Sequence, residues 1–350
     1  MYSKFNKNEV RFEKNNYSYN RKTVTFEDKF NIHPRDVIQK MDSAGDDIPC
    51  LIPSFPIRIP KAGVIRKNIP VTIRNPFDND NFTQISCDIN LMTGIPHLKR
   101  GIHMSRIGDL VAQSISEIIS NSATKVYNSL QEYAAYLATK LGNSQYGETS
   151  SINVTGKLYY LEFVKGWKME KNKVSLEQIE LKASADCSGD NLIQSAGIQF
   201  SNMSACPCVQ QTYKHALSFD EKINVSSEIP LLTHSQRCHT AIMLSGISEE
   251  LPIVPLLETV DKIIVRTQNT LPREYELLNV YRAHEEPQFM EDVVRQILMG
   301  IYSLFKETFP ESTIKVSSLS MESIHDYDII SEIEVSIEEI SSFLMNKEHD

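Results

Sequence analysis

Apolar and polar residues alternate with a period of two in several segments of the chain, a spacing typical of half-buried β-strands. The segments that predict strands are residues 69–75, 82–92, 152–165, 174–187, 195–205, 238–246, 312–321 and 328–337. In the last of these, isoleucine and valine alternate with glutamate and serine. Such strands would each bury one face and leave the other face polar.

Apolar residues spaced three and four apart predict helices between these strands. The first pair covers residues 110–119 and 126–141, with Gly142 as a stop signal, and the second covers 256–264 and 287–301. Pro287 suits a first helical position. Each half of the chain therefore has the order strand-strand-helix-helix-strand-strand. This order predicts an α+β fold in which helices lie on one face of an antiparallel sheet.

The doubled order divides the chain into two modules, residues 46–190 and 191–345. Residues 1–45 precede them and are rich in Asn, Lys, Ser and Tyr without sustained periodicity. We expect these residues to form a disordered tail, because such a composition buries little apolar surface.

Composition limits the classes of function. The net charge of the 350-residue chain is −9, which disfavours a nucleic-acid binder but leaves room for a small anionic ligand. No segment approaches the roughly 20 apolar residues that span a bilayer, and the N-terminus lacks the apolar core of a secretory signal. We therefore expect a cytoplasmic protein without membrane partners. Its six cysteines then favour metal binding or chemistry over disulfides.

Two thiols flank a single proline in the segment Cys206-Pro207-Cys208. A thiolate binds Zn²⁺ or Fe²⁺ strongly, and a thiol with a perturbed pKa can transfer protons. The alternative is a pair of buried structural cysteines, and the pair by itself does not decide between the two.

Several histidines could act with these thiols. His234 lies just before the strand predicted at 238–246, and neutral imidazole is the commonest metal ligand. His215 and His239 compete with it, and a lone histidine is more often a surface or packing residue. Between the last two predicted strands, Glu322 precedes His325 by three residues, so that the carboxylate could orient an imidazole for acid-base chemistry. Chance pairs of this kind are common.

A basic segment, Arg100–Arg106, precedes the first predicted helix. Free N–H groups and partial positive charge at a helix start suit a polyphosphate, although a merely polar helix entry would look the same. The chain contains no G-x-x-x-x-G-K-[ST] or G-x-G-x-x-G segment, which disfavours the common nucleotide-binding folds.

Together these segments resemble the motifs of the type IB GTP cyclohydrolases. The matching segments and family motifs are Arg100–Arg106 with GxHMSR, Ser204–Gln210 with TACPCAQ of the archaeal branch, Thr233–Arg237 with THxQR, Ala283–Asp292 with AHxNPxFVED, and Glu322–His325 with ESIH. They occur in the family's order over residues 60–340, which is more specific than any single match.

The resemblance implies tandem tunnelling-fold (T-fold) modules, each ββααββ, in a homodimer or homotetramer with active sites at subunit interfaces. It implies metal-dependent hydrolysis of GTP at guanine C8 with release of formate. The archaeal MptA-type branch uses Fe(II), for which Mn or Zn can substitute, and gives 7,8-dihydroneopterin 2′,3′-cyclic phosphate for methanopterin-type cofactors. Bacterial members instead give 7,8-dihydroneopterin triphosphate for folate biosynthesis.

Matched motif by motif, the resemblance implies that Cys206 and His234 bind the metal. Residues 275–278 resemble the family's YELL, so Glu276 is expected to be the third ligand. Cys208 is expected to transfer protons beside the metal.

The remaining roles concern the substrate. The resemblance implies that His325, supported by Glu322, is a general acid-base. It also implies that His103, Arg106 and Arg237 are substrate-binding residues, with His103 and Arg106 serving phosphate binding or the structure of the site. The chain is shorter than the family pattern after the YELL match, which leaves the guanine-binding residue open. Its candidates are Glu274, Glu276 and Glu285.

Two rival interpretations come from other classes. The nitrile reductase of queuosine synthesis is a related T-fold enzyme that uses NADPH, but its lysine-rich substrate motif is absent here. A structural metal protein would close a four-ligand site with Cys206, Cys208, His234 and one further residue. Three ligands and an open position would favour catalysis instead.

Overall fold

A computed structural model describes residues 47–115, 125–164, 173–218 and 230–347. The chain divides into two compact units, Met1–Leu51 and Ile52–Asp350. In the described part of the first unit, Ile48–Cys50 forms a short 3-10 helix, η1. The predicted tail, residues 1–45, lies outside the described residues. None of the described helices has the length and apolar character needed to cross a bilayer.

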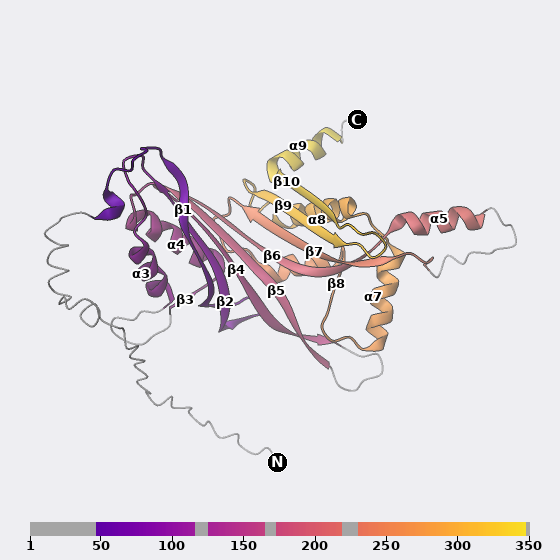
Figure 1. The fold of residues 1–350 in the computed structure, drawn as a ribbon. Helices are drawn as coiled ribbons and strands as arrows, with labels where there is room; N and C mark the ends of the chain where they lie inside the picture. The colour runs from indigo at the N-terminus through magenta and orange to yellow at the C-terminus, as the bar shows by residue number, and fades with distance from the viewer. Residues whose placement is uncertain (1–46, 116–124, 165–172, 219–229, 348–350) are drawn as a thin grey trace, which may run out of the picture. The chain divides into compact units, whose positions relative to one another are not determined.

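The second unit alternates strands and helices along the chain (Figure 1). In order, its elements are β1 (Ile59–Asn75), β2 (Asp78–Ile95), α3 (Met104–Ile115), β3 (Val126–Tyr127), α4 (Leu130–Ser144), β4 (Thr149–Val164), β5 (Lys173–Ser188), β6 (Asn191–Ala205), α5 (Pro207–Ser218), β7 (Ser235–Ser245), α6 (Ile253–Asp261), β8 (Val265–Arg266), α7 (Arg273–Glu285), α8 (Met290–Phe305), β9 (Thr313–Met321), β10 (Ile329–Ser336) and α9 (Ile337–Lys347).

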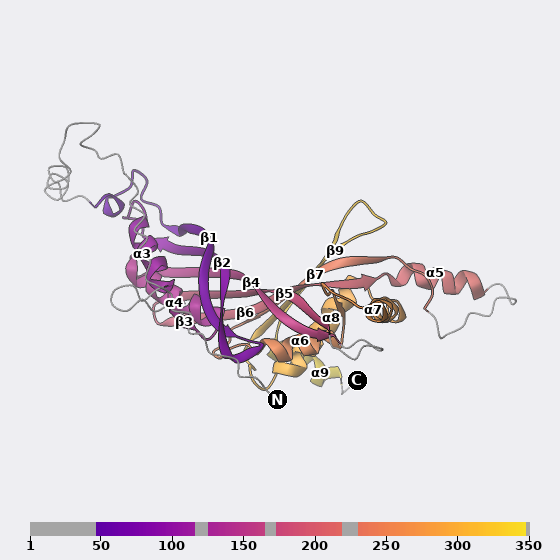
Figure 2. The same ribbon diagram turned by 90° about the horizontal axis from the view of Figure 1, so that it is seen from below.

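The described strands form one ten-stranded sheet with the order β10-β9-β7-β6-β5-β4-β2-β1-β3, and β8 pairs with β6 off this path. All pairs are antiparallel except β1 with β3. Helices α3, α4, α6 and α8 lie on one face of the sheet (Figure 2). The predicted α+β class, with a large antiparallel sheet and helices on one side, is therefore confirmed.

The core lies between this sheet face and the helices, where the alternating pattern buries every second strand residue. On β2, Cys87, Ile89 and Leu91 are fully buried, and on α4 Tyr133 and Leu137 are fully buried. Successive strand side chains point to opposite faces, so the residues between them face solvent. The alternation of apolar and polar residues along the strands thus determines which face of the sheet the helices cover.

The structure corrects several predicted helix limits. Val126 belongs to the short strand β3, and α4 begins after Ser129, whose side chain accepts a hydrogen bond from Glu132 N. α6 ends at Asp261, and α8 begins at Met290 instead of Pro287. The sequence patterns missed α5, α7 and α9. In α7 the reason is clear, because Ala283 is its one buried residue and no apolar stripe marks it.

The predicted module boundary at residues 190–191 falls in the tight turn between β5 and β6. These strands pair from Ser188 and Asn191 onward, so the sheet continues across the boundary. The strand-strand-helix-helix-strand-strand order recurs on either side of it, with β3, α5, β8, α7 and α9 added.

Gly197 provides a test of this sheet. A Cβ at Gly197 would lie 1.9 Å from the carbonyl oxygen of Ile242 and 2.5 Å from Met243 Sδ. We expect Gly197→Ala to lower the free energy of unfolding by about 3 kcal/mol or more, because the neighbouring backbone must move. Urea unfolding of the full chain measures this.

The matched control is Gly108→Ala in α3, where an added Cβ meets nothing within 4 Å. There alanine should stabilise by up to about 1 kcal/mol through its helix propensity. Equal stability of the Gly197→Ala variant and the wild type would contradict the close approach of β6 and β7.

Candidate metal and catalytic site

Three strands bring distant parts of the chain together at one end of the sheet. Ala205, the last residue of β6, pairs with Ser235, the first residue of β7. Cys206 continues this ladder, since its backbone N–H donates to the carbonyl of His234 at 3.0 Å. The Thr233 hydroxyl also donates to the carbonyl of Cys206 at 2.6 Å. The backbones of Cys206 and His234 are therefore direct neighbours.

The end of β9 lies on the other side of β7. Arg237 pairs with Met321, so the chain after Met321 passes over the first residues of β7. Strand alternation places Cys206, His234 and Glu322 on the helix-covered face, because each lies an even number of residues from a buried residue of its strand. Those buried residues are Ser204, Cys238 and Ser320.

The two thiols adjoin at the start of α5. Pro207 occupies the first position of this helix, which suits a residue without an N–H group. The Cys206 thiol lies close enough to the Cys208 thiol to affect its ionisation. Desolvation, and then the neighbouring Cys206, raise the pKa of the Cys208 thiol, although Cys208 is exposed. The pair therefore places a thiol next to the end of β6 and a second one toward solvent.

The imidazole of His234 faces a buried carboxylate. Its Nδ1 lies 4.0 Å from Glu322 Oε2, and the two side chains are 11% and 4% exposed. The hydroxyl of Ser323 lies 3.3 Å from the same Nδ1. On the other side, Ser320 Oγ donates to Glu322 Oε1 at 2.7 Å. One ring nitrogen of His234 thus has polar neighbours on the β9 side.

The thiol of Cys238, on β7, lies near the carboxylate of Glu322. It is fully buried, and it interacts with the Ser320 hydroxyl and with the charge of Glu322. Burial raises the pKa of the Cys238 thiol to about 11, while its hydrogen bond with Ser320 opposes the rise. The thiol therefore stays neutral near pH 7 and adds no charge beside Glu322.

Glu276 lies apart from this group within the described chain. It is exposed in the first turn of α7, and its side chain does not join those of Cys206 and His234 within 4.8 Å. α7 meets the site through its opposite end, where Gln210 of α5 donates to the carbonyl of His284 at 2.7 Å. Glu276 is about 12 Å further along the helix at 1.5 Å per residue.

Hydrogen bonds anchor the chain on both sides of α7. Before the helix, the backbone N–H of Asn269 donates to the buried carboxylate of Glu177 at 3.1 Å, and that of Thr270 donates to Ser175 Oγ at 3.0 Å. After the helix, Gln288 N–H donates to the carbonyl of Ala205 at 3.1 Å. These bonds place the first turn of α7 beside β5 and its last turn beside the end of β6.

Of the predicted phosphate-binding residues of the first module, His103 directly precedes α3 and Arg106 lies near its start. The backbone N–H of His103 donates to Gln145 Oε1 at 3.0 Å, and its ring is 5.5 Å from that of Tyr146. Arg106 donates to the carbonyl of Ser144 at 3.3 Å. Within one described chain they are not part of the cluster around Cys206.

The other two predicted residues are exposed. Arg237 lies on β7 one residue before the buried Cys238, and it therefore faces away from the helices, as His239 does. His325 is exposed in the β9–β10 connection, and its ring stacks on Tyr327 with centroids 4.9 Å apart. The structure therefore places the carboxylate of Glu322 against His234 and leaves His325 with an aromatic partner, a pairing opposite to the expected one.

The two competing histidines have different surroundings. His239 faces away from the helices, and its Nδ1 is 3.1 Å from Ser201 Oγ. His215 is exposed on α5. Sequence patterns missed Ser320, Ser323 and Cys238. Alternation could have indicated Ser320 and Cys238, because it places them on the same face as Glu322 and His234.

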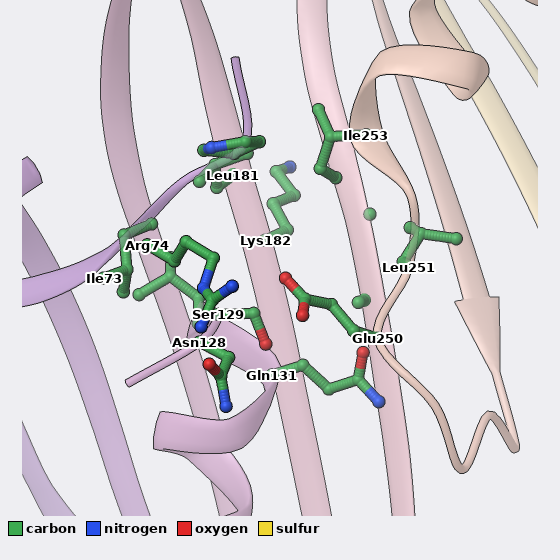
Figure 3. A pocket seen from close by; sticks show the side chains of 14 residues that line it. Ile73, Arg74, Asn128, Ser129, Gln131, Leu181, Lys182, Glu250, Leu251 and Ile253 are labelled. Atoms are coloured by element: carbon green, nitrogen blue, oxygen red, sulfur yellow. The ribbon is translucent and has the colours of Figure 1, made fainter. Parts of the chain in front are cut away.

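Two of the cavities that lie along the sheet differ about tenfold in volume. One of about 330 Å³ adjoins the end of β6 and is lined by residues that include Ser204, Lys262, Arg282, Glu285 and Gln288. The other, of about 30 Å³, lies between the start of α4 and the loop before α6, with the side chains of Arg74 and Glu250 facing each other across it (Figure 3). The second has room for about two water molecules, too little for a nucleotide.

Comparison with known proteins gives a consistent family. A family model described as type I GTP cyclohydrolase folE2 matches residues 46–331. A relative from Thermoplasma volcanium named GTP cyclohydrolase MptA is 26% identical over 287 residues, covering 81% of this chain and 92% of that protein. One of the same name from Thermoplasma acidophilum is 27% identical over 303 residues, covering 84% and 96%.

Among solved structures, a uricase from Arthrobacter globiformis aligns with a TM-score of 0.42 and 9% identity, covering 79% of this chain and 94% of the uricase. A uricase from Bacillus fastidious aligns with a TM-score of 0.38 and 9% identity, covering 82% and 94%. At these TM-scores the likeness carries no conclusion about the site.

Proposed function

Because this chain belongs to the type I GTP cyclohydrolase folE2 family, we propose that it hydrolyses GTP at C8 of guanine and releases formate. The observation that carries the proposal is made at three strand ends, where the backbones of Cys206 and His234 are hydrogen-bonded and the side chain of His234 faces that of Glu322. These residues come from segments far apart in sequence, all within the range that the family model matches.

The finer points of the proposal concern product and fold. We propose 7,8-dihydroneopterin 2′,3′-cyclic phosphate as the product, for methanopterin-type biosynthesis, since relatives named MptA cover most of the chain. Release of 7,8-dihydroneopterin triphosphate is the alternative. We further propose that residues 46–190 and 191–345 are tandem T-fold modules of a cytoplasmic homodimer or homotetramer.

The donor atoms at the strand ends suit a divalent metal. Cys206 offers sulfur and His234 offers an imidazole whose Nδ1 already faces polar groups, which leaves Nε2 for a ligand bond. We propose Fe(II) as the metal, with Mn or Zn able to substitute. Glu276 would complete the ligand set in the assembled enzyme. Such a metal supplies a hydroxide near neutral pH by lowering the pKa of bound water.

The protein's own groups then handle protons and substrate binding. One water adds at C8 and the bond from C8 to N9 breaks, which leaves a formamide on N7. A second water then adds to this formamide, the bond from C8 to N7 breaks, and C8 leaves as formate. The released nitrogens each need a proton, which we assign to Cys208 and His325 as acids. Cys208 adjoins Cys206, and His325 follows Glu322 in the same loop.

Substrate binding involves cationic and polar groups on more than one element. Arg237 is exposed on β7, on the face of the sheet opposite His234, and we assign it to phosphate oxygens in the assembled enzyme. His103 and Arg106 are assigned to phosphates from a second copy of the chain, because within one chain they pack on α4. The guanine-binding glutamate remains to be chosen among Glu274, Glu276 and Glu285, of which Glu285 lines the cavity of about 330 Å³.

Anaerobic incubation with GTP tests the proposal. Full-length protein loaded with Fe(II) should release formate and yield a dihydroneopterin phosphate whose mass distinguishes cyclic phosphate from triphosphate. Chelator-treated protein and ATP as substrate are the controls, and neither should give formate. If the loaded protein binds metal tightly but leaves GTP unchanged, the structural metal-protein interpretation replaces the enzyme.

A further inference from the structure

The carboxylate of Glu322 is buried at the mouth of the proposed metal site, and no lysine or arginine of the described residues pairs with it. Only 4% of its side chain is exposed. Among the described residues, the single ion pair that includes Glu322 is the one with His234 Nδ1 at 4.0 Å. A buried carboxylate is costly unless its oxygens accept hydrogen bonds. Ser320 satisfies Oε1 at 2.7 Å, which leaves His234 as the group facing Oε2.

We propose that Glu322 is a positioning residue for His234. The charge of the carboxylate, whose Oε2 lies 4.0 Å from Nδ1, favours the tautomer with the proton on Nδ1 and a lone pair on Nε2. It also restricts rotation of the ring, so that Nε2 stays available for a ligand bond. The inference rests on the proposed metal site and replaces the expected role of Glu322 beside His325.

The order of the strands in the sheet keeps Glu322 next to His234. β7 lies between β6 and β9, so His234 has Cys206 on one side and the chain after Met321 on the other. Ser320 Oγ holds Glu322 from within β9, and Asp328 Oδ1 accepts the backbone N–H of Glu322 at 3.3 Å. The carboxylate is thus placed by its own strand end before any metal binds. Mutating a carboxylate that orients a metal-binding histidine typically weakens metal affinity 10–100-fold.

The hydroxyl of Ser323 competes with the carboxylate of Glu322 for Nδ1 of His234. Its hydroxyl is 3.3 Å from Nδ1 and could either accept from Nδ1–H or donate to Nδ1. Donation would put the ring proton on Nε2 and block a ligand bond there. Ser323 is exposed, whereas Glu322 is buried and charged, so we assign the dominant contact to the carboxylate.

Metal affinity of the full chain tests the inference. Competition with a chelator for Co(II), under anaerobic conditions, gives the affinity of each variant. Glu322→Gln keeps the size of the side chain and loses its charge, and should weaken binding about 10–100-fold. Ser323→Ala should change it less than about threefold. The matched control is Glu334→Gln, an exposed glutamate of β10 that pairs with Lys315 and should leave affinity unchanged.

A proton NMR measurement distinguishes a role of Glu322 in positioning His234 from a general role in the stability of the fold. In the Co(II) protein, the exchangeable Nδ1–H of a bound imidazole gives a shifted proton resonance, which should exchange faster with solvent in Glu322→Gln. Wild-type affinity and exchange in Glu322→Gln would overturn the inference, as would an equal loss in Ser323→Ala. A loss as complete as in His234→Ala would make Glu322 a ligand instead. If Cys206→Ala and His234→Ala both keep wild-type affinity, the proposed metal site itself fails.

Discussion

Replacing Cys206 with alanine is expected to abolish metal binding and, with it, turnover of GTP. The thiolate is one of two donors that the strand ends bring together, and His234 alone would hold a divalent ion weakly. Removing a ligand also leaves the hydroxide-forming chemistry without its metal. Elemental analysis of the purified variant, beside formate release from GTP, measures both losses.

Cys208→Ala is the matched control for this prediction. It removes a thiol two residues away, which adjoins Cys206 but points toward solvent. We expect this variant to keep its metal and to lose most of its turnover, because Cys208 is assigned as a proton donor. Equal metal loss in both variants would make Cys208 a ligand and would favour a structural site with two thiolates.

His325→Ala is expected to lower kcat by roughly 10²–10⁴-fold, the usual contribution of a general acid-base. The residue lies three positions after Glu322 in the β9–β10 connection, and its ring is exposed and stacks on Tyr327. Since no metal ligand is removed, metal content should match that of the wild type. Single-turnover formate release across a range of pH gives the size of the loss.

Tyr327→Leu provides a control for the packing of this loop. It removes the stacking partner of His325 but retains the imidazole, so kcat should fall far less than in His325→Ala. Turnover of His325→Ala at the wild-type rate at every pH would exclude His325 from the mechanism. Cys208 and metal-bound water would then be the remaining proton carriers.

The local patterns of the sequence were sufficient for the class of fold. A period of two along eight segments and helical spacing between them depend only on neighbouring residues, and these patterns correctly predicted an antiparallel sheet with helices on one face. They failed where an element buries little. α7 buries only Ala283, so the physical signal that marks an amphipathic helix is absent from its sequence.

The motifs also indicated which residue types belong to the proposed site, because thiol and imidazole donors are chemical properties of single residues. Cys206, Cys208 and His234 needed only their order in the chain and the resemblance to be selected. Whether these residues lie close together in space depends instead on the register of β6 against β7.

Only the tertiary structure decided the partners of these residues. Glu322 is three residues from His325 in sequence, yet its carboxylate faces His234, because β9 pairs with β7 and carries the chain across the start of that strand. Likewise Glu276 lies at the far end of α7, held there by the contacts of Glu177 with Asn269. Strand register and helix anchoring join residues that are distant in sequence, and no local pattern encodes either one.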